Sequence, residues 1–271
     1  MLKMDKIFRC GEEFSGFKKY KVLVLFGLKF KKSVKAEMIN GMNNKVYINT
    51  EEGQKLLSEK QIKKSNVDIS VLGSNNLVEL DESVLKNSKY LNLSINGNGN
   101  KVHIDYVKSI LGSIEVSGNN HVIEIEKSND MYLNIVEGST CDHEGCYLKI
   151  GENCSCLGLS VFLYQNNTAV VVGKDCLFAQ EVIMQSSDGH KIINNETGEL
   201  LNQKPYKIEI GDHVWVGRRA SILKNAKISS NSIVGYNAVV TGDFKQENVV
   251  IAGNPAKVVK QGINWDVDTV F

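Results

Sequence analysis

The sequence predicts an all-β solenoid, a chain that winds repeatedly around one apolar core. Three observations predict this fold class: a strict six-residue repeat near the C-terminus, a looser repeat of turns and strands in the N-terminal half, and one polar interruption of the six-residue pattern. Neither a half-buried strand nor a helix has a period of six. A short strand followed by a tight turn does, and three such strands close one triangular coil. Stacked coils pair their backbones and bury a continuous core.

The bulk composition is that of an ordinary globular protein, with 42% hydrophobic and 23% charged residues. The net charge of +1 provides no global field that would attract nucleic acid. Lysines surround an apolar run at 22–26, which is too short to span a bilayer, since spanning needs about 20 apolar residues. This favours a docking strand or helix over contact with a membrane surface. The six cysteines include no C-x-x-C pair, so we interpret them as reduced core residues of a cytoplasmic protein.

The N-terminal half divides into a cap and irregular coils. We expect residues 1–38 to form the cap, because the end of a solenoid exposes strand edges. Residues 39–149 are expected to form irregular coils, with a polar helix inserted at 51–64. Each coil has Gly and Asn at a turn, where a positive φ is tolerated, followed by an alternating strand. The repeats are GMNNKVYI (41–48), GSNNLVEL (73–80), GNGNKVHI (97–104) and GNNHVIEI (118–125).

Residues 150–260 carry the six-residue pattern, and residues 261–271 form a C-terminal tail. Aliphatic first positions are expected to point inward, and small fifth positions to fit beneath the turns. The strict first positions are Ile210, Val216, Ile222, Ile228, Val234 and Val240, and the matching fifth positions are Val214, Ala220, Ala226, Ser232, Ala238 and Phe244. Upstream, the first positions are Ile150, Cys156, Phe162, Val172, Phe178 and Met184, and the fifth positions are Cys154, Ser160, Cys176 and Val182.

The pattern stops at SSDGHK (186–191) and resumes after the mostly polar stretch 190–207. Coils stack only if each turn of the solenoid keeps its length, so an insertion must protrude. Protruding loops on rigid scaffolds commonly carry function. We therefore predict a functional loop at 190–207.

The stretch IEIGDHVWVGRRASILKNAKISSNSIVGYNAVVTGDF, followed by IAGNPAKVVK, resembles the hexapeptide-repeat acyltransferases. With SSDGH and a loop containing TGE (197–199), it looks like the branch that acetylates sugars of capsules and lipopolysaccharides. The resemblance implies a left-handed parallel β-helix, a homotrimer, and acetyl-CoA bound in the groove between two subunits. The left hand rests on the resemblance alone, because parallel crossovers are otherwise almost always right-handed.

The resemblance assigns catalysis to three residues. His190 matches the general base, and imidazole suits the removal of a proton from a sugar hydroxyl near neutral pH. Asp188 is expected to orient or stabilise that imidazole. If the chain turns there, Ser186 or a backbone carbonyl takes this role instead. Trp215 matches a tryptophan near the acceptor and the thioester, where an indole excludes water and donates its N–H.

The resemblance also implies positions along the cofactor and the acceptor. A backbone N–H near Gly217 is the expected oxyanion donor. The remaining cofactor positions, which border the pantetheine or the CoA phosphates, are Arg218, Tyr236, Thr241, Lys257 and Lys260. Arg218 and Tyr236 depart from the family pattern because these positions are usually small. The residues expected to bind acceptor hydroxyls are Ser186, Asn194, Asn195 and Asn202. No metal is expected, since His103, His121 and His143 lie apart from the motifs.

The leading hypothesis is an acetyl-CoA-dependent O-acetyltransferase acting on a sugar or glycan. Transfer is expected to be direct, in a ternary complex, because no cysteine or serine lies in a clear nucleophile motif. One alternative is N-acetylation of an amino-sugar nucleotide, although no G-x-G-x-x-G opens a helix. Another alternative, from a different class, is a non-catalytic solenoid that binds partners.

Overall fold

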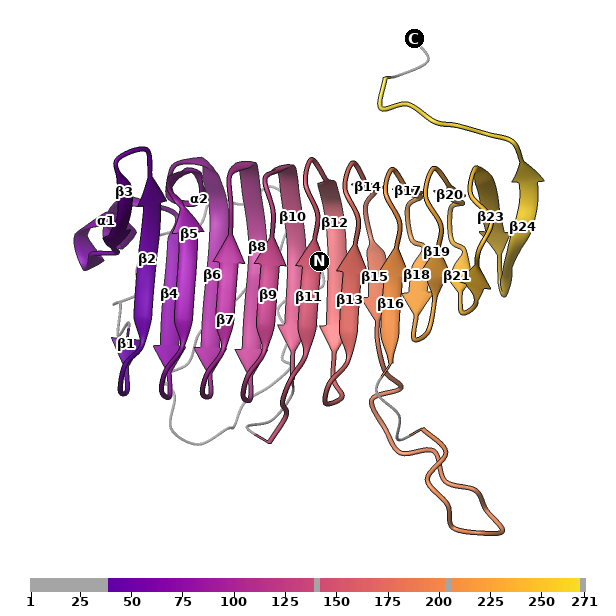
Figure 1. Cartoon of the computed structure of the whole chain (residues 1–271), viewed down its shortest axis with the longest axis horizontal. Helices are drawn as coiled ribbons and strands as arrows, with labels where there is room; N and C mark the ends of the chain where they lie inside the picture. The colour runs from indigo at the N-terminus through magenta and orange to yellow at the C-terminus, as the bar shows by residue number, and fades with distance from the viewer. Residues whose placement is uncertain (1–38, 139–141, 203–205, 269–271) are drawn as a thin grey trace, which may run out of the picture. The chain divides into compact units, whose positions relative to one another are not determined.

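The computed structural model describes residues 39–138, 142–202 and 206–268. The predicted cap at 1–38 lies outside the described residues. The described chain consists almost entirely of parallel strands that wind around one core, so the predicted β-solenoid is confirmed (Figure 1). None of the described helices is long and apolar enough to cross a membrane.

The C-terminal coils have three strands each, and equivalent strands stack into three parallel rows. The first row is β14 (Leu177–Phe178), β17 (Trp215–Val216), β20 (Ile233–Val234) and β23 (Val249–Gly253). The second row is β15 (Val182–Gln185), β18 (Ser221–Leu223) and β21 (Val239–Val240). The third row is β13 (Ala169–Val172), β16 (Lys207–Ile210), β19 (Lys227–Ile228) and β22 (Asp243–Phe244).

Burial follows the six-residue pattern. All first positions between Ile210 and Val240 are buried, and so are the fifth positions except Phe244, which is only partly buried. Asparagines with positive φ occupy the corners, among them Asn225, Asn231 and Asn237. Small fifth-position side chains leave room for these tight turns, while β-branched first-position side chains fill the core.

One upstream coil departs from the predicted register. Phe162 and Ser160 are only partly buried, while Val161 and its neighbours Leu159 and Leu163 point inward. Cys156 pairs with Phe178, but Val161 pairs with Met184, so this coil is one residue shorter than the next. The two hexads merge into a single strand, β12 (Ser155–Leu163), and the predicted inward positions at 160 and 162 are wrong by one residue.

The N-terminal coils use longer strands, so that each coil has two strands rather than three. One stack consists of β1 (Ile39–Asn40), β4 (Val67–Leu72), β6 (Ser88–Asn96), β8 (Val107–Ser117) and β10 (Ser128–Glu137), which pairs with β12. The opposing stack consists of β2 (Lys45–Thr50), β5 (Leu77–Asp81), β7 (Lys101–Ile104), β9 (Val122–Ile125) and β11 (Tyr147–Ile150). The four predicted repeats lie in register at β2, β5, β7 and β9, as expected.

A buried polar ladder explains the asparagines of these repeats. The side chain of Asn76 donates to the carbonyl of Gly97 at 2.8 Å, and that of Asn100 donates to the carbonyl of Gly118 at 2.9 Å. The backbone N–H of Asn100 donates to the side-chain oxygen of Asn76. In the next coil, the backbone N–H of His121 donates to the side-chain oxygen of Asn100. Each amide therefore satisfies the turn of the neighbouring coil, where an unpaired carbonyl would be costly.

The predicted helix at 51–64 is wrong in its first half. Gly53, with φ +111°, turns the chain back, and β3 (Gly53–Leu56) pairs antiparallel with β2. The helix α1 (Glu59–Lys64) begins only after Ser58, whose backbone N–H donates to the Gln61 side chain at 3.1 Å in a capping box. A second short helix, α2 (Glu82–Asn87), follows β5.

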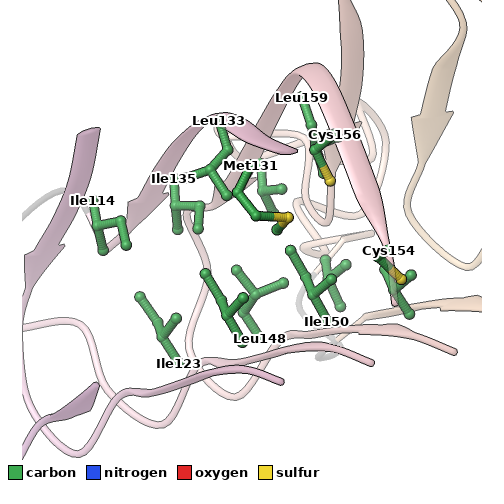
Figure 2. Close-up of a cluster of buried hydrophobic side chains, with 14 of the residues drawn as sticks. Ile114, Ile123, Met131, Leu133, Ile135, Leu148, Ile150, Cys154, Cys156 and Leu159 are labelled. Carbon is green, nitrogen blue, oxygen red and sulfur yellow. The ribbon is translucent and has the colours of Figure 1, made fainter. Parts of the chain in front are cut away.

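The core is one continuous cluster of aliphatic side chains that runs through the coils (Figure 2). Cys146, Cys154, Cys156 and Cys176 are free and buried within it, as the sequence predicts. Burial raises the pKa of the Cys146 thiol to about 11, so these thiols act as small apolar side chains rather than nucleophiles. At the C-terminal end, β24 (Ala256–Gln261) pairs antiparallel with β23.

Candidate functional site

The interruption of the repeat is a protruding loop. It joins the end of β15 at Gln185 to the start of β16 at Lys207, and it extends away from the coils (Figure 1). An antiparallel bridge between Ile193 and Leu200 narrows it into a hairpin-like arm. The loop thus begins four residues earlier than predicted and ends one residue earlier, because Lys207 already pairs with Ala169.

Ser186 is not available to an acceptor, contrary to the sequence prediction. Its side chain is fully buried, and its hydroxyl donates to the carbonyl of Phe162 at 3.4 Å. The reason is the alternation of β15: Val182 and Met184 point inward, and Ser186 continues the same row beyond the end of the strand. Because its hydroxyl faces the core, Ser186 is a structural residue of the last inward position before the loop.

The chain turns at Gly189, whose φ of +76° favours glycine. This turn brings His190 out of the coil, and its imidazole is exposed to solvent. Its backbone carbonyl accepts a hydrogen bond from the Asn202 side chain at 2.7 Å. The predicted base therefore lies at the root of the loop, accessible to a substrate and fixed through its backbone.

Asp188 is paired with groups other than the histidine. Its carboxylate forms an ion pair with Lys224 and accepts a hydrogen bond from the Asn202 amide at 2.9 Å. Partial burial raises the pKa of Asp188, but the hydrogen bonds from Lys224 and Asn202 and the charge of Lys224 lower it more, so the net pKa is below its usual value. Asp188 is thus held ionised at the root of the loop.

Lys224 is a residue that the sequence reasoning missed. It lies in the turn after β18, directly below the root of the loop, and its ammonium also lies 4.9 Å from the centre of the Tyr206 ring. Lys224 therefore contacts both ends of the insertion, Asp188 at its start and Tyr206 at its end. A polar third position in a hexad carries no distinctive signal, so its role became visible only when the coils were stacked.

The loop asparagines are largely engaged within the loop. Both amide N–H groups of Asn202 are used, on Asp188 and on the His190 carbonyl, and its oxygen accepts from the Ile192 N–H at 2.9 Å. The Asn194 oxygen accepts from the backbone N–H groups of Glu196 and Thr197, which forms a turn. Asn195 is exposed. Asn202 is thus engaged in shaping the loop, whereas the acceptor contacts expected of Asn194 and Asn195 stay predictions.

Trp215 lies in the first row, on the outer side of β17. Its side chain is 38% exposed, whereas its neighbour Val216 is buried. Among the described residues its indole nitrogen has no hydrogen-bond partner. Its ring centre lies 6.2 Å from that of Trp265, which stacks on His213 with 4.3 Å between ring centres. The sequence reasoning missed both neighbours, although the chain has only two tryptophans and a motif contains one of them.

Gly217 cannot supply its own N–H to an oxyanion. That N–H donates to the carbonyl of Val234 in the next coil at 2.7 Å. An oxyanion donor near Gly217 therefore stays a prediction that its own N–H does not fulfil. A Cβ at position 217 would lie 2.8 Å from the same oxygen, and the close approach of adjacent coils therefore explains the glycine. Coil stacking consumes backbone donors of this kind throughout the solenoid.

Arg218 and Tyr236 lie on neighbouring coils, as their spacing predicts. The Arg218 guanidinium pairs with Glu181 at 2.6 Å, and Arg219 also pairs with Glu181 and donates to the Tyr236 hydroxyl at 3.1 Å. Hydrogen bonds from Arg219 and Arg218 lower the pKa of Glu181. The two predicted cofactor residues therefore belong to an exposed cluster in which Glu181 offsets part of the positive charge.

The remaining predicted cofactor residues are all exposed. Thr241 directly follows β21, at the corner that also holds Lys224. Lys257 and Lys260 lie in β24, and neither forms an ion pair within the described part of the chain. Their ammonium groups are therefore free to meet an anion.

His190 and Trp215 lie on opposite sides of the coil. The loop leaves the corner between the second and third rows, whereas Trp215 faces outward from the first row. In a triangular coil, each face lies opposite the corner that the other two faces form. In Figure 1 the loop accordingly projects from one edge of the coils, while the segment that carries Trp265 runs along the other. One chain therefore cannot bring His190 and Trp215 to the same reacting atoms.

Metal ligands do not gather anywhere in the part of the chain that is described. No group of three or more His, Cys, Asp or Glu residues there is arranged to hold a metal ion. His121 instead belongs to the buried ladder, and its Nδ1 accepts from the Cys146 N–H at 3.1 Å. Burial lowers its pKa, which favours the neutral imidazole that this hydrogen bond requires.

Comparisons with known proteins agree with this architecture. The family model described as bacterial transferase hexapeptide (six repeats) matches residues 207–242. The polysialic acid O-acetyltransferase of Neisseria meningitidis is 35% identical over 195 residues, which cover 71% of this chain and 86% of the relative.

Two solved structures share the fold. The crystal structure of a polySia-specific acetyltransferase superposes with a TM-score of 0.66 at 30% identity, covering 76% of this chain and 91% of the other. A polysialic acid O-acetyltransferase superposes with a TM-score of 0.63 at 31% identity, covering 73% of this chain and 90% of the other. The predicted fold class is therefore confirmed.

Proposed function

This chain belongs to the hexapeptide-repeat acetyltransferases, close to the polysialic acid O-acetyltransferases, and we propose that it transfers an acetyl group from acetyl-CoA to a hydroxyl of an anionic bacterial polysaccharide. The observation that carries the proposal is the similarity over 86% of the Neisseria relative. The exposed His190 at the root of the loop supplies the chemistry. The activity of these relatives, polysialic acid O-acetylation, favours O-acetylation over the N-acetylation of an amino-sugar nucleotide.

His190 acts as the general base in this proposal. A sugar hydroxyl is a weak nucleophile, and its proton must leave as its oxygen bonds to the acetyl carbon. His190 accepts that proton, the carbon–sulfur bond of the thioester breaks, and the proton passes to the departing sulfur. Such a base accelerates transfer by about 10²–10⁴-fold. The free N–H of Trp215 donates to the oxygen on which negative charge develops, a role that the engaged N–H of Gly217 cannot take.

The proposed site is shared between subunits. His190 and Trp215 face opposite sides of one coil, so a second copy must supply the tryptophan that faces a given histidine. A closed ring of three copies repeats this contact three times. We therefore propose a homotrimer with acetyl-CoA in the groove between copies. Lys257 and Lys260 lie exposed toward the end of the first row and would meet the CoA phosphates.

The arm at 186–206 covers the acceptor in this arrangement. Because it projects beyond the coils, it can reach a neighbouring copy, and its exposed residues include Lys191 and Asn195. The arm carries both signs of charge, with Lys191 as well as Glu196 and Glu199, so the anionic acceptor is proposed from the relatives and not from the charge of the arm. The N-terminal coils provide a long surface along which such a polymer can lie.

An acetylation assay tests the proposed function. The protein is incubated with isotopically labelled acetyl-CoA and, separately, polysialic acid, a neutral glycan and an amino-sugar nucleotide, and the products are analysed by mass spectrometry. We expect labelled O-acetyl groups on the anionic polymer. We expect His190→Ala to lose at least about 10²-fold in rate, while the control Lys245→Ala, whose side chain is 85% exposed outside the loop, keeps most of it. N-acetylation of the nucleotide, or full activity of His190→Ala, would contradict the proposal.

A further inference from the structure

The residues that follow β24 are held against the coils by hydrogen bonds. Residues 262–268, the C-terminal segment, run back from β24 along one edge of the coils (Figure 1), and Trp265 of this segment contacts Trp215 of β17. The Ile263 N–H donates to the Asn248 carbonyl at 3.0 Å, and the Asn248 amide donates back to the Ile263 carbonyl at 3.1 Å. This reciprocal pair fixes the path of the segment toward the turn that precedes Trp215.

Trp265 anchors the C-terminal segment on that turn. Its indole N–H donates to the carbonyl of His213 at 2.9 Å, and the His213 ring Nε2–H donates to the carbonyl of Trp265 at 3.1 Å. The two rings stack with 8° between their planes. His213 has a left-handed φ of +55°, which places its ring beside the segment. Two hydrogen bonds and one stack thus hold a side chain that lies 50 residues beyond Trp215 in the sequence.

The Trp265 ring also contacts Trp215. The ring centres are 6.2 Å apart and the planes meet at 45°, an arrangement within the favourable range for aromatic pairs. Trp215 itself comes from a strand of two residues, is 38% exposed, and has no hydrogen bond from its indole nitrogen within the described part of the chain. Among the described residues, Trp265 provides the only aromatic contact of Trp215.

We propose that Trp265 is a positioning residue for acetyl transfer, which holds the Trp215 indole in its working orientation. The inference rests on the proposed function, in which Trp215 borders the reacting groups. A misplaced donor loses transition-state stabilisation without losing substrate binding to the same extent. An aromatic pair of this kind shifts an equilibrium about two- to tenfold.

The pair provides its own spectroscopic signal. The chain has two tryptophans, so all of its tryptophan fluorescence comes from Trp215 and Trp265. Two indoles at this separation also couple in circular dichroism, and the coupling depends on their mutual orientation. The contact can therefore be followed in the intact protein, independently of any acetyl transfer.

The test compares Trp265→Ala and Trp265→Phe with wild type, and Val267→Ala serves as a control because Val267 is 73% exposed in the same segment. Steady-state kinetics with acetyl-CoA and polysialic acid, the pH profile, the tryptophan dichroism and the melting temperature are measured for each. We expect Trp265→Ala to lower kcat about two- to tenfold with a smaller change in KM. The phenylalanine variant keeps the ring contacts and should recover most of the rate. The pH profile should not move, because His190 is untouched.

The outcomes separate the two proposals. A wild-type protein that transfers no acetyl group rejects the proposed function and this role with it. An active wild type that Trp265→Ala matches in kcat, while the coupled dichroism is lost, rejects the role of Trp265 alone. If the alanine variant does not fold, the phenylalanine variant decides: a rate that falls only in parallel with the loss of folded protein on heating assigns Trp265 to stability and overturns the inference.

Discussion

At the scale of single residues, buried polar groups reveal what the coils require. Asn76 and Asn100 are buried, and the amides of both form hydrogen bonds to neighbouring coils. Glu137 is the contrary case. It ends β10 facing the core, in register with Val116 and Leu163, and neither of its oxygens has a hydrogen-bond partner among the residues that the structure describes. Burial raises the pKa of Glu137 well above its usual value.

Glu137 is therefore expected to make the stability of the fold depend on pH. Above the usual pKa of about 4.5, the unfolded chain ionises at this position while the folded chain keeps its proton. The folded state then binds more protons, so its stability falls as pH rises from 4.5 toward the raised pKa, and levels off beyond it. Glu137→Met should remove this decline and add about 1–3 kcal/mol to the unfolding free energy at neutral pH. Denaturant unfolding at several pH values measures this, with the exposed Glu144→Met as the control. An equal pH slope in Glu137→Met and wild type would refute the assignment.

At the scale of elements, the root of the loop is held by one clasp. Lys224 from the turn after β18 pairs with Asp188, Asn202 bonds Asp188 and the His190 carbonyl, and Lys224 also lies over Tyr206. The clasp connects the rigid coils to the residue that the proposed mechanism depends on. The order of the arm thus depends on groups that are neighbours only after the coils have stacked.

Lys224→Met should loosen this clasp without changing the core. Methionine keeps the length of the side chain but loses the charge-assisted hydrogen bond to Asp188, an interaction worth about 1.5–3 kcal/mol. We expect kcat/KM to fall roughly tenfold and the amide of Ile192 to exchange hydrogen faster. Lys227→Met, on the next strand and 51% exposed, is the matched control. Wild-type exchange and kinetics in Lys224→Met would show that the clasp does not position His190.

The positions of strands and turns were predictable where consecutive coils have the same length and the same hydrogen-bonding pattern. The inward positions between Ile210 and Val240 and the Gly–Asn turns follow directly from spacing. The one-residue shift at Phe162 does not follow from spacing, because the composition of this stretch does not indicate that two hexads merge into the single strand β12. The misassignment of Ser186 arose because a serine in a polar stretch gives no sign that it continues an inward row.

The site was only partly predictable, for a related reason. The motif with His190 and Trp215 was recognisable, but the partners of Asp188 lie at 202 and 224, far along the chain. Trp265 lies in a tail without any pattern, and only the return path of the C-terminal segment brings it to Trp215. Contacts of this type depend on tertiary packing, which spacing along the sequence does not encode.

For the whole molecule, the separation of His190 from Trp215 determines how many chains the proposed site requires. Because the two residues lie on opposite sides of a coil, the proposed site, which combines them, needs two copies of the chain. If either residue is lost, every site in a uniform assembly is incomplete. If two different defective chains assemble together, some sites again receive one intact histidine and one intact tryptophan.

Mixing His190→Ala with Trp215→Ala chains tests this claim most directly. Each variant is purified, the two are unfolded and refolded together in equal amounts, and acetyl transfer to polysialic acid is measured beside each variant refolded alone. With random assembly of a closed ring, about one quarter of the sites combine an intact His190 with an intact Trp215. If the site is shared between subunits, we expect the mixture to regain about a quarter of wild-type activity, while each variant alone stays inactive. A mixture no more active than its components, in assemblies shown by mass spectrometry to contain both chains, would contradict it.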